Sequence, residues 1–309
     1  MTILVTGANG QIGTVLCEKL RDLHGQHNVI GSDIVKMKEH REPFVMLDIL
    51  NVQRIQEVID DFKIDQIYHL AAILSANGEW NPQKTWNVNL NGTLSILEIS
   101  RLNKIKKIFY PSSIAVFGKT TPKNMTGQDV PMLPETVYGM SKLAGEHWCY
   151  YYHKRYDLDV RSLRFPGIIS FESPPGGGTT DYAVNIFHQA VNEGAYTCFL
   201  KKDTRLPMMY MPDAIRATLE IMETPAEQLK IRTSYNIAGM SITPLEIARE
   251  IQKFIPQFKI DYQPDFRQAI ADSWAHSIDD SPARNDWGWK PEFDLEKTAL
   301  DMIQNLQFK

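Results

Sequence analysis

Thr6-Gly7-Ala8-Asn9-Gly10-Gln11-Ile12-Gly13 is the stretch that decides the fold of this 309-residue chain. A short β-branched run, 3–6, leads into it, and an amphipathic stretch, 11–23, follows. Glycines in the pattern GxxGxxG permit a tight turn, close backbone approach to a pyrophosphate, and close packing of a helix on a strand. The same trio is compatible with a plain strand-to-helix turn. Its place between a strand and a helix favours a dinucleotide-binding turn.

Three later positions fit the same ligand. Asp33 ends the second predicted strand, twenty residues after Gly13. A carboxylate there accepts hydrogen bonds from both adenosine ribose hydroxyls and repels a 2′-phosphate, which favours NAD over NADP. Asp48, followed by Ile49, is a candidate for the adenine amino group and equally for a turn. Leu70-Ala71-Ala72 ends the third strand with small residues that let the backbone approach a cofactor, and we interpret the preceding His69 as structural.

The first half of the chain alternates β-branched runs with helical stretches. This rhythm predicts an α/β fold of Rossmann type, a doubly wound parallel sheet with ligands at the carboxyl ends of its strands. The predicted strands are 3–6, 29–33, 66–70, 107–112 and 160–165, and the predicted helices are 11–23, 52–62, 82–102 and 137–156.

After residue 165 the rhythm changes. A loop is predicted at 173–178, where Pro and Gly gather. The elements predicted beyond it are helices 179–192, 213–222, 244–254 and 295–306 and strands 207–211, 234–237 and 259–262. We therefore expect residues 1–165 to form the NAD-binding domain and residues 166–309 mainly a smaller α/β lid that binds the substrate, with some segments returning to the first domain.

Composition excludes several classes of protein. The formal charge of −4 offers no electrostatic reason to expect nucleic acid or an acidic membrane as a partner. No apolar run approaches the ~18 residues of a transmembrane helix, and no basic segment precedes an apolar one at the start. Cys17, Cys149 and Cys198 lack metal-ligand spacing. We expect no metal, and a reduced, cytoplasmic compartment.

Two tyrosine–lysine pairs share a spacing of four residues, Tyr138 with Lys142 and Tyr150 with Lys154. On a helix such a pair shares one face, and a cation beside a phenol lowers its pKa, normally ~10, so that it can abstract a proton. Tyr138 lies in the first turns of the predicted helix 137–156, at the cofactor edge of the sheet. Tyr150 lies about 18 Å further along the axis, in an aromatic cluster expected in the core or at an interface.

Pro111-Ser112-Ser113 ends the fourth strand at the same edge, so one of these hydroxyls can hydrogen-bond a substrate oxygen while Tyr138 removes its proton. With Asn87-Val88-Asn89 and Gly92-Thr93, these residues resemble the short-chain dehydrogenase/reductase superfamily in its extended, epimerase-like branch. The resemblance implies that Tyr138 is the general base and Lys142 lowers its pKa and binds the nicotinamide ribose. It favours Ser113 over Ser112 for orienting the substrate.

The resemblance also implies a set of cofactor contacts. The expected residues are Gly7, Asn9, Gly10, Gln11, Ile12, Gly13, Asp33, Asp48, Ile49, Leu70, Ala71, Ala72, Asn89, Ser112, Tyr138, Lys142, Pro166 and Ile168. One departure concerns the substrate. Sugar-nucleotide epimerases of this branch usually follow the fifth strand with an Arg-Tyr-Phe-Asn type of sequence, whereas here it reads Arg164-Phe165-Pro166-Gly167. This counts against a nucleotide-sugar substrate.

A narrower resemblance rests on 175–183 (Pro-Gly-Gly-Gly-Thr-Thr-Asp-Tyr-Ala), on 73–79 and on 279–289. These stretches are similar to short-chain-type L-threonine 3-dehydrogenases, which implies oxidation of L-threonine to 2-amino-3-oxobutanoate with NAD and without a metal. The leading alternative is a nucleotide-sugar epimerase or dehydratase, whose pocket would be lined by arginines such as Arg205, Arg267 or Arg284. A catalytically dead NAD sensor is disfavoured, since the serine, tyrosine and lysine are intact.

The glycine-rich stretch is expected to present free N–H groups at a helix start, suited to a small carboxylate. An ordinary loop with threonine caps is the competing interpretation. Asp181 and Glu79 are candidates for the substrate's amino group, and Trp274 is a candidate for the wall of the pocket. The expected substrate-binding residues are Ser75, Ser113, Tyr138, Gly178, Thr179, Thr180, Asp181 and Trp274. The aromatic helix 137–156 further predicts a homodimer, because related enzymes often pair through such helices.

Overall fold

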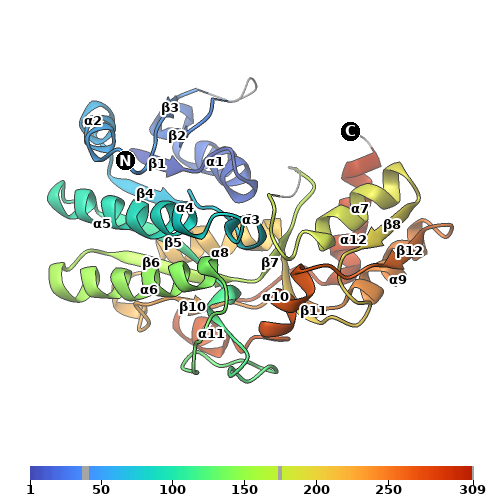
Figure 1. Ribbon diagram of the computed structural model, residues 1–309. Helices are drawn as coiled ribbons and strands as arrows, with labels where there is room; N and C mark the ends of the chain where they lie inside the picture. The colour runs from blue at the N-terminus through green and yellow to red at the C-terminus, as the bar shows by residue number, and fades with distance from the viewer. Residues whose placement is uncertain (37–41, 173–175, 308–309) are drawn as a thin grey trace.

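The computed structural model describes residues 1–36, 42–172 and 176–307. Its centre is a seven-stranded parallel sheet in the order β10-β6-β5-β4-β1-β2-β3, flanked by helices on both faces (Figure 1). The predicted Rossmann-like fold is therefore confirmed. The strands are β1 (Ile3–Thr6), β2 (Val29–Asp33), β3 (Phe44–Met46), β4 (Gln66–His69), β5 (Lys107–Ser113), β6 (Val160–Phe165) and β10 (Tyr235–Asn236).

Alternation along each strand sends side chains to two cores, one on each face of the sheet. Ile3 and Val5 of β1 face one core, whereas Leu4 between them faces the other. The first core is closed by α1 (Gln11–His24), α8 (Met211–Glu223) and α11 (Ser281–Trp287). The second is closed by α2 (Val52–Phe62), α5 (Gly92–Leu102) and α6 (Val137–Tyr156). The buried runs of β-branched residues thus follow from burial on both sides.

The smaller lid lies beside the sheet (Figure 1). A three-stranded sheet of order β11-β9-β7 and a parallel pair, β12-β8, pack with helices around a third core. The elements are β7 (Gly167–Ile169), β8 (Ala195–Cys198), β9 (Leu206–Tyr210), β11 (Met240–Ile242), β12 (Lys259–Tyr262), α7 (Tyr182–Asn192), α9 (Pro244–Phe254), α10 (Arg267–Ser273) and α12 (Leu295–Gln307).

Several predicted boundaries differ from the structure. The strands β3, β7, β8 and β11 have only three or four residues each, too short for a periodic signal. The helix predicted at 179–192 begins only at Tyr182, because 179–181 form a turn. The helix predicted at 82–102 is α4 (Pro82–Trp86), a π-helical turn (Asn87–Asn91) and α5. Of the loop predicted at 173–178, residues 173–175 lie outside the described part of the chain.

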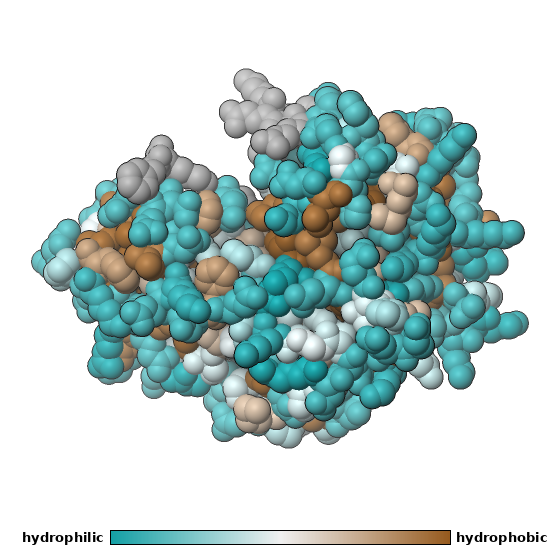
Figure 2. Space-filling view, turned by 180° about the vertical axis from the view of Figure 1, so that it is seen from behind, coloured by the Kyte–Doolittle hydropathy of each residue, from teal (hydrophilic) through white to brown (hydrophobic). Residues whose placement is uncertain are grey.

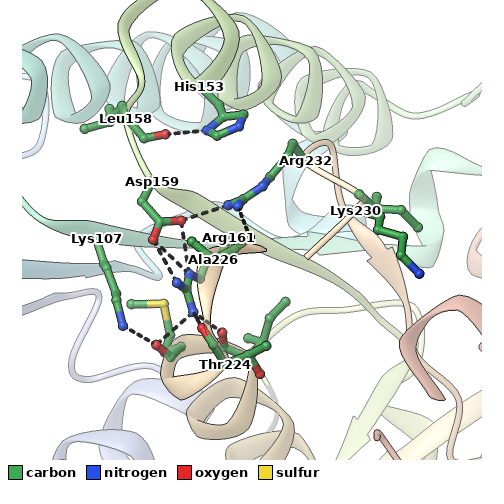
Figure 3. Close-up of polar contacts among 12 residues, drawn as sticks. Lys107, His153, Leu158, Asp159, Arg161, Thr224, Ala226, Lys230 and Arg232 are labelled. Atoms are coloured by element: carbon green, nitrogen blue, oxygen red, sulfur yellow. Dashed lines mark hydrogen bonds and ion pairs between the residues drawn. The ribbon is translucent and has the colours of Figure 1, made fainter. Parts of the chain in front are cut away.

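Arg161 fastens α8 to the edge of the sheet away from the cofactor end (Figure 3). Its Nη1 donates to the carbonyl oxygens of Ile221, Met222 and Thr224 at 2.6–2.9 Å. Its Nε and Nη2 bind the Asp159 carboxylate, which Arg232 also contacts at 2.9 Å. The cation thereby neutralises the carbonyl end of α8 and holds it against β6.

The face opposite to that of Figure 1 is mostly hydrophilic, with apolar side chains gathered in a hollow near its middle (Figure 2). Among the described helices, none is long and apolar enough to span a bilayer.

We predict that Arg161→Met lowers the free energy of unfolding at pH 7 by about 3 kcal/mol, because it leaves three carbonyls without their cation and Asp159 with Arg232 alone. Burial raises the pKa of Asp159, but hydrogen bonds and charges from Arg161 and Arg232 outweigh burial and lower it. The stabilisation therefore exists above the ordinary carboxyl pKa of ~3.9 and is lost as pH falls through the lowered folded-state pKa.

Urea unfolding at pH 7 and near pH 3 measures the loss of stability and its dependence on pH. Arg161→Met should lose less stability than the wild type when the pH is lowered. Arg54→Met is the matched control, since its pair with Glu57 is exposed and contributes under ~1 kcal/mol. Equal losses of unfolding free energy in Arg161→Met and Arg54→Met would contradict the stabilising role of Arg161.

Candidate active site

A cleft of ≈ 440 Å³ opens at the carboxyl ends of β1, β4, β5 and β6, between the sheet and the lid. Most of the residues expected from the sequence line it, although they come from separate segments of the chain. Those residues are Gly7, Gly10, Gln11, Ile12, Gly13, Leu70, Ala72, Ser75, Ser112, Ser113, Tyr138, Lys142, Pro166, Ile168, Gly178, Thr180, Asp181 and Trp274. The parallel sheet explains the convergence, because all its strands end at one edge.

The glycine turn leaves room for a ligand. A Cβ on Gly13 would meet the Gly7 carbonyl oxygen at 2.2 Å, so only glycine lets α1 start this close to the turn. Gln11, the first residue of α1, has a buried side-chain nitrogen with no hydrogen-bond partner among the described residues. An unpaired buried donor beside a helix N-terminus fits a phosphate group.

Seven expected residues do not line the cleft. Asp33 accepts hydrogen bonds from the Asn9 and Ile34 backbone nitrogens at 3.1 and 2.8 Å, which places it beside the glycine turn. Asp48 accepts from the Leu50 nitrogen and thus forms a turn. The others are Asn9, whose side-chain nitrogen donates to the Val35 carbonyl oxygen at 2.6 Å; Ile49, buried; Ala71, behind the turn; Asn89; and Thr179, buried against Ser75.

Asn89 does not line the cleft itself but contacts a residue that does. Its side chain bonds both the nitrogen and the carbonyl oxygen of Ile73, a lining residue, at 2.8 and 2.9 Å. It lies in the π-helical turn, where the widened helix directs its amide toward β4. As expected, His69 is structural: Thr6 and Thr93 bond its two ring nitrogens, and burial lowers its pKa to about 3.

Tyr138 meets Ser113 because α6 approaches the end of β5 closely. A Cβ on Gly139 would meet the Ala115 carbonyl oxygen at 2.1 Å, so a larger residue would push α6 away. The Ser113 hydroxyl lies close enough to the Tyr138 phenol to favour its ionisation. Lys142, one turn on, places its Nζ 2.7 Å from the Pro111 oxygen and 5.6 Å from the centre of the Tyr138 ring.

Desolvation dominates the protonation of this group. Burial raises the pKa of Tyr138 to about 12, and the hydrogen bond with Ser113 offsets this only in part. Burial lowers the pKa of Lys142 to about 8. The direction differs from the sequence-based expectation of a lowered tyrosine pKa, because the cost of burying a phenolate outweighs the hydrogen bond with Ser113.

The two candidate serines have different partners. The Ser112 hydroxyl donates to Glu146 Oε1 at 2.5 Å, and the Glu146 carboxylate is held by Arg164 at 2.8–2.9 Å. Glu146 and Arg164 are both buried, and Arg164 also donates to the oxygens of Gln128 and Asn236. This network occupies Ser112 and leaves Ser113 facing Tyr138.

Tyr150 and Lys154 lie outside the cleft. The Tyr150 side chain is 44% exposed on the outer side of α6, whereas Lys142 is buried. The same four-residue spacing therefore occurs once in the cleft and once on the exposed side of the helix. Position along the helix separates them, as the sequence indicated.

The backbone N–H groups of the glycine-rich loop are not free to bind a ligand, contrary to expectation. The nitrogens of Gly177 and Gly178 each donate to Asp181 Oδ2 at 2.8 Å, so the chain's own carboxylate fills the site expected for a substrate carboxylate. The nitrogen and hydroxyl of Thr179 contact the Ser75 hydroxyl at 3.2 and 3.1 Å. Thr180 lines the cleft.

Charged candidates outside the cleft are paired elsewhere. Glu79 accepts from the Val137 nitrogen at the start of α6. Arg205 binds Glu246, Arg267 binds Asp265, and Arg284 binds Asp280. Among the described lining residues, Lys142 is the one cation and Asp181 the one carboxylate.

Sequence reasoning missed Asn77 and Glu146. The Asn77 side chain donates to the Gly176 oxygen, and its nitrogen donates to the Gly177 oxygen, which ties the lid loop to α3 (Ser75–Gly78). A signal for Glu146 existed: Arg164 lies between Leu163 and Phe165 in a predicted strand, and a buried arginine requires a charged or polar partner. Nothing local marks Asn77, because its partners lie about a hundred residues away.

The sheet, the glycine turn and the cleft define a Rossmann-type protein that binds a dinucleotide. Residues 3–238 match the family described as NAD dependent epimerase/dehydratase family. The mitochondrial L-threonine 3-dehydrogenase of Bos taurus is 48% identical over 97% of this chain and 81% of its own length. The chain belongs to the NAD dependent epimerase/dehydratase family, and its cofactor is a nicotinamide dinucleotide.

Solved structures agree with this placement. The holo form of a GalE-like L-threonine dehydrogenase from Cupriavidus necator has a TM-score of 0.97 and 53% identity, covering 99% of this chain and 100% of that one. A monomeric L-threonine 3-dehydrogenase from a metagenome, in the apo form, has a TM-score of 0.97 and 46% identity, covering 99% of both chains.

We predict that Glu146→Gln lowers the free energy of unfolding by about 3 kcal/mol, because Arg164 then keeps a buried, uncompensated charge. Urea unfolding at pH 7 measures the loss. Glu57→Gln, in an exposed pair with Arg54, should change it by under ~1 kcal/mol. A loss for Glu146→Gln no larger than this control would show that the pair is not a major constraint.

Proposed function

We propose that this enzyme oxidises L-threonine to 2-amino-3-oxobutanoate with NAD. The observation that carries the proposal is the cleft in which Ser113 and Tyr138 face a lining with one cation and one carboxylate. The high identity to L-threonine dehydrogenases over nearly the whole chain supports the same substrate. A secondary alcohol that also carries an ammonium and a carboxylate suits this small set of charges.

In this mechanism Ser113 hydrogen-bonds the threonine hydroxyl and Tyr138, as phenolate, removes its proton. A bound NAD would supply the acceptor for the hydride that leaves the β-carbon of threonine. The C–H and O–H bonds of threonine break, a carbonyl forms, and the proton passes from Tyr138 to solvent. Lys142 favours the phenolate by its charge and binds the nicotinamide ribose.

The cofactor would lie along the turn from Gly7 to Gly13, with the adenosine ribose at Asp33. The unpaired Gln11 nitrogen and the N-terminus of α1 suit the pyrophosphate. We propose NAD rather than NADP, because a 2′-phosphate would meet the Asp33 carboxylate. Pro166 and Ile168, at the start of the lid, would contact the nicotinamide end.

For the substrate, we propose that Asp181 accepts the ammonium group, since it is the one described carboxylate in the lining. The substrate carboxylate would bind the hydroxyls of Ser75 and Thr180, because the glycine N–H groups are occupied by Asp181. Trp274 closes the pocket opposite. A nucleotide sugar fits less well, because its diphosphate would find no lining arginine among the described residues.

Association and location are further proposals. The outer side of α6 exposes Trp148, Tyr150, Tyr151 and Tyr156, an apolar aromatic surface that suits pairing of two copies through this helix. We propose a homodimer, although one similar threonine dehydrogenase structure is described as monomeric. The three cysteines are buried free thiols, which suits a reduced compartment such as the cytoplasm.

Tyr138→Phe should lower kcat for L-threonine at least about 100-fold, because it removes the proton acceptor. Absorbance of NADH after addition of L-threonine and NAD measures turnover, and binding of NAD should be largely retained. Tyr150→Phe is the matched control on the same helix and should keep its activity. Turnover of a sugar nucleotide without turnover of threonine by the wild type would overturn the proposal.

The pH profile should also report on Tyr138. Since burial raises its pKa and only the phenolate acts as base, kcat/KM for threonine should rise with pH across the neutral range. Lys142→Met removes the cation that favours the phenolate, so its rising limb should move to higher pH. Steady-state rates between pH 6 and 10 test this. If the rate rises over the same pH range in the wild type and in Lys142→Met, Lys142 does not influence the ionisation of Tyr138.

A further inference from the structure

Lys123 lies in the segment 117–136 that precedes α6, and its side chain reaches across to the lid. Its Nζ donates to the carbonyl oxygens of Asp272, Ser273 and Trp274 at 3.2, 2.6 and 2.9 Å. An ammonium has three donors, so this one segment uses all of them. The residue is about 150 positions away from its partners in the sequence.

The backbone around Lys123 binds the same segment from its other end. The Lys123 carbonyl oxygen accepts from the nitrogens of His276 and Ser277 at 2.7 and 3.2 Å. The Thr126 nitrogen donates to the Ser277 carbonyl oxygen at 2.9 Å, and the Met125 nitrogen donates to its hydroxyl at 2.8 Å. Trp274 is thus held between a cation on one side and backbone hydrogen bonds on the other.

The position of the cation has an electrostatic reason. The helix α10 ends at Ser273, and Trp274 is its C-cap. The last carbonyls of a helix have no intrahelical partners. Three such oxygens in a part-buried place carry partial negative charge, which a lysine near the helix C-terminus compensates. Burial lowers the pKa of Lys123, which agrees with an ammonium withdrawn from water.

The consequence reaches the cleft through Trp274. Trp274 is 4% exposed and belongs to the lining of the same cleft as Tyr138. The direction of a side chain follows from its backbone, and here Lys123 holds that backbone. A shift of about 1 Å in such a wall is enough to weaken substrate positioning strongly.

We propose that Lys123 is a positioning residue, which sets Trp274 as the wall of the substrate pocket without touching substrate or cofactor. The inference rests on the proposed threonine site and adds to it a residue from the opposite half of the chain. It also assigns a role to the segment before α6, which binds residues 272–277.

Lys123→Met keeps most of the side chain and removes the three donors. It should raise KM for L-threonine about tenfold, change kcat less than about twofold, and leave KM for NAD unchanged, because the glycine turn is untouched. Lys123→Arg retains a cation with several donors and should restore most of the affinity. Lys107→Met is the matched control: that lysine binds the Met222 carbonyl oxygen at 2.7 Å, far from the cleft.

A double-mutant cycle with Trp274→Ala tests whether the effect passes through Trp274. In that background Lys123→Met should change KM for threonine less than about twofold. Additive effects, an unchanged KM, or an equal rise of KM for NAD and threonine would each overturn the proposal.

Amide hydrogen exchange gives a readout without substrate. Residues 272–278 should exchange faster in Lys123→Met than in the wild type, whereas α6 and α1 should not change. A wild type without threonine turnover would defeat the proposed function alone, and unchanged exchange at 272–278 would defeat the placement of Trp274 by Lys123.

Discussion

The buried ion pair between Glu146 and Arg164 is the constraint on which the active-site edge depends. It joins α6 to β6, and through Ser112 it reaches the end of β5. Arg164 extends the network to Gln128 and to Asn236 of β10. A charge pair removed from water is tolerated only when every group has a partner, so these elements have one mutual arrangement. Tyr138, two turns before Glu146, takes its position from that arrangement.

The chemistry of the cleft depends on which polar groups already have hydrogen-bond partners within the protein. Polar groups that the fold already uses, such as Ser112, Glu79 and the nitrogens of Gly177 and Gly178, are not available to a ligand. The groups that remain in the lining are few: the hydroxyls of Ser75, Ser113, Tyr138 and Thr180, the ammonium of Lys142, and the carboxylate of Asp181. A cleft with so few free charges is selective because a wrong ligand would leave its own charges unpaired.

The lid is held by contacts that run between distant parts of the chain. Asn77 and Ser75 bind the loop at 176–179, and Lys123 binds the turn at Trp274. None of these contacts comes from the apolar packing that forms the lid's own core. Polar contacts between the lid and the sheet-bearing half therefore help to shape the pocket, in addition to the apolar packing of residues 114–117 against the lid core.

Local sequence determined the parallel sheet, the glycine turn and the shared face of Tyr138 and Lys142, because these follow from periodicity and short-range sterics. It also separated Tyr138 from Tyr150, since distance along a helix is a local quantity. Only the tertiary structure decided that Ser113 rather than Ser112 faces Tyr138, that Asp181 occupies the glycine loop, and that burial governs the tyrosine pKa. Hydrogen-bond partners and desolvation depend on residues far away in the chain, and no local pattern records them.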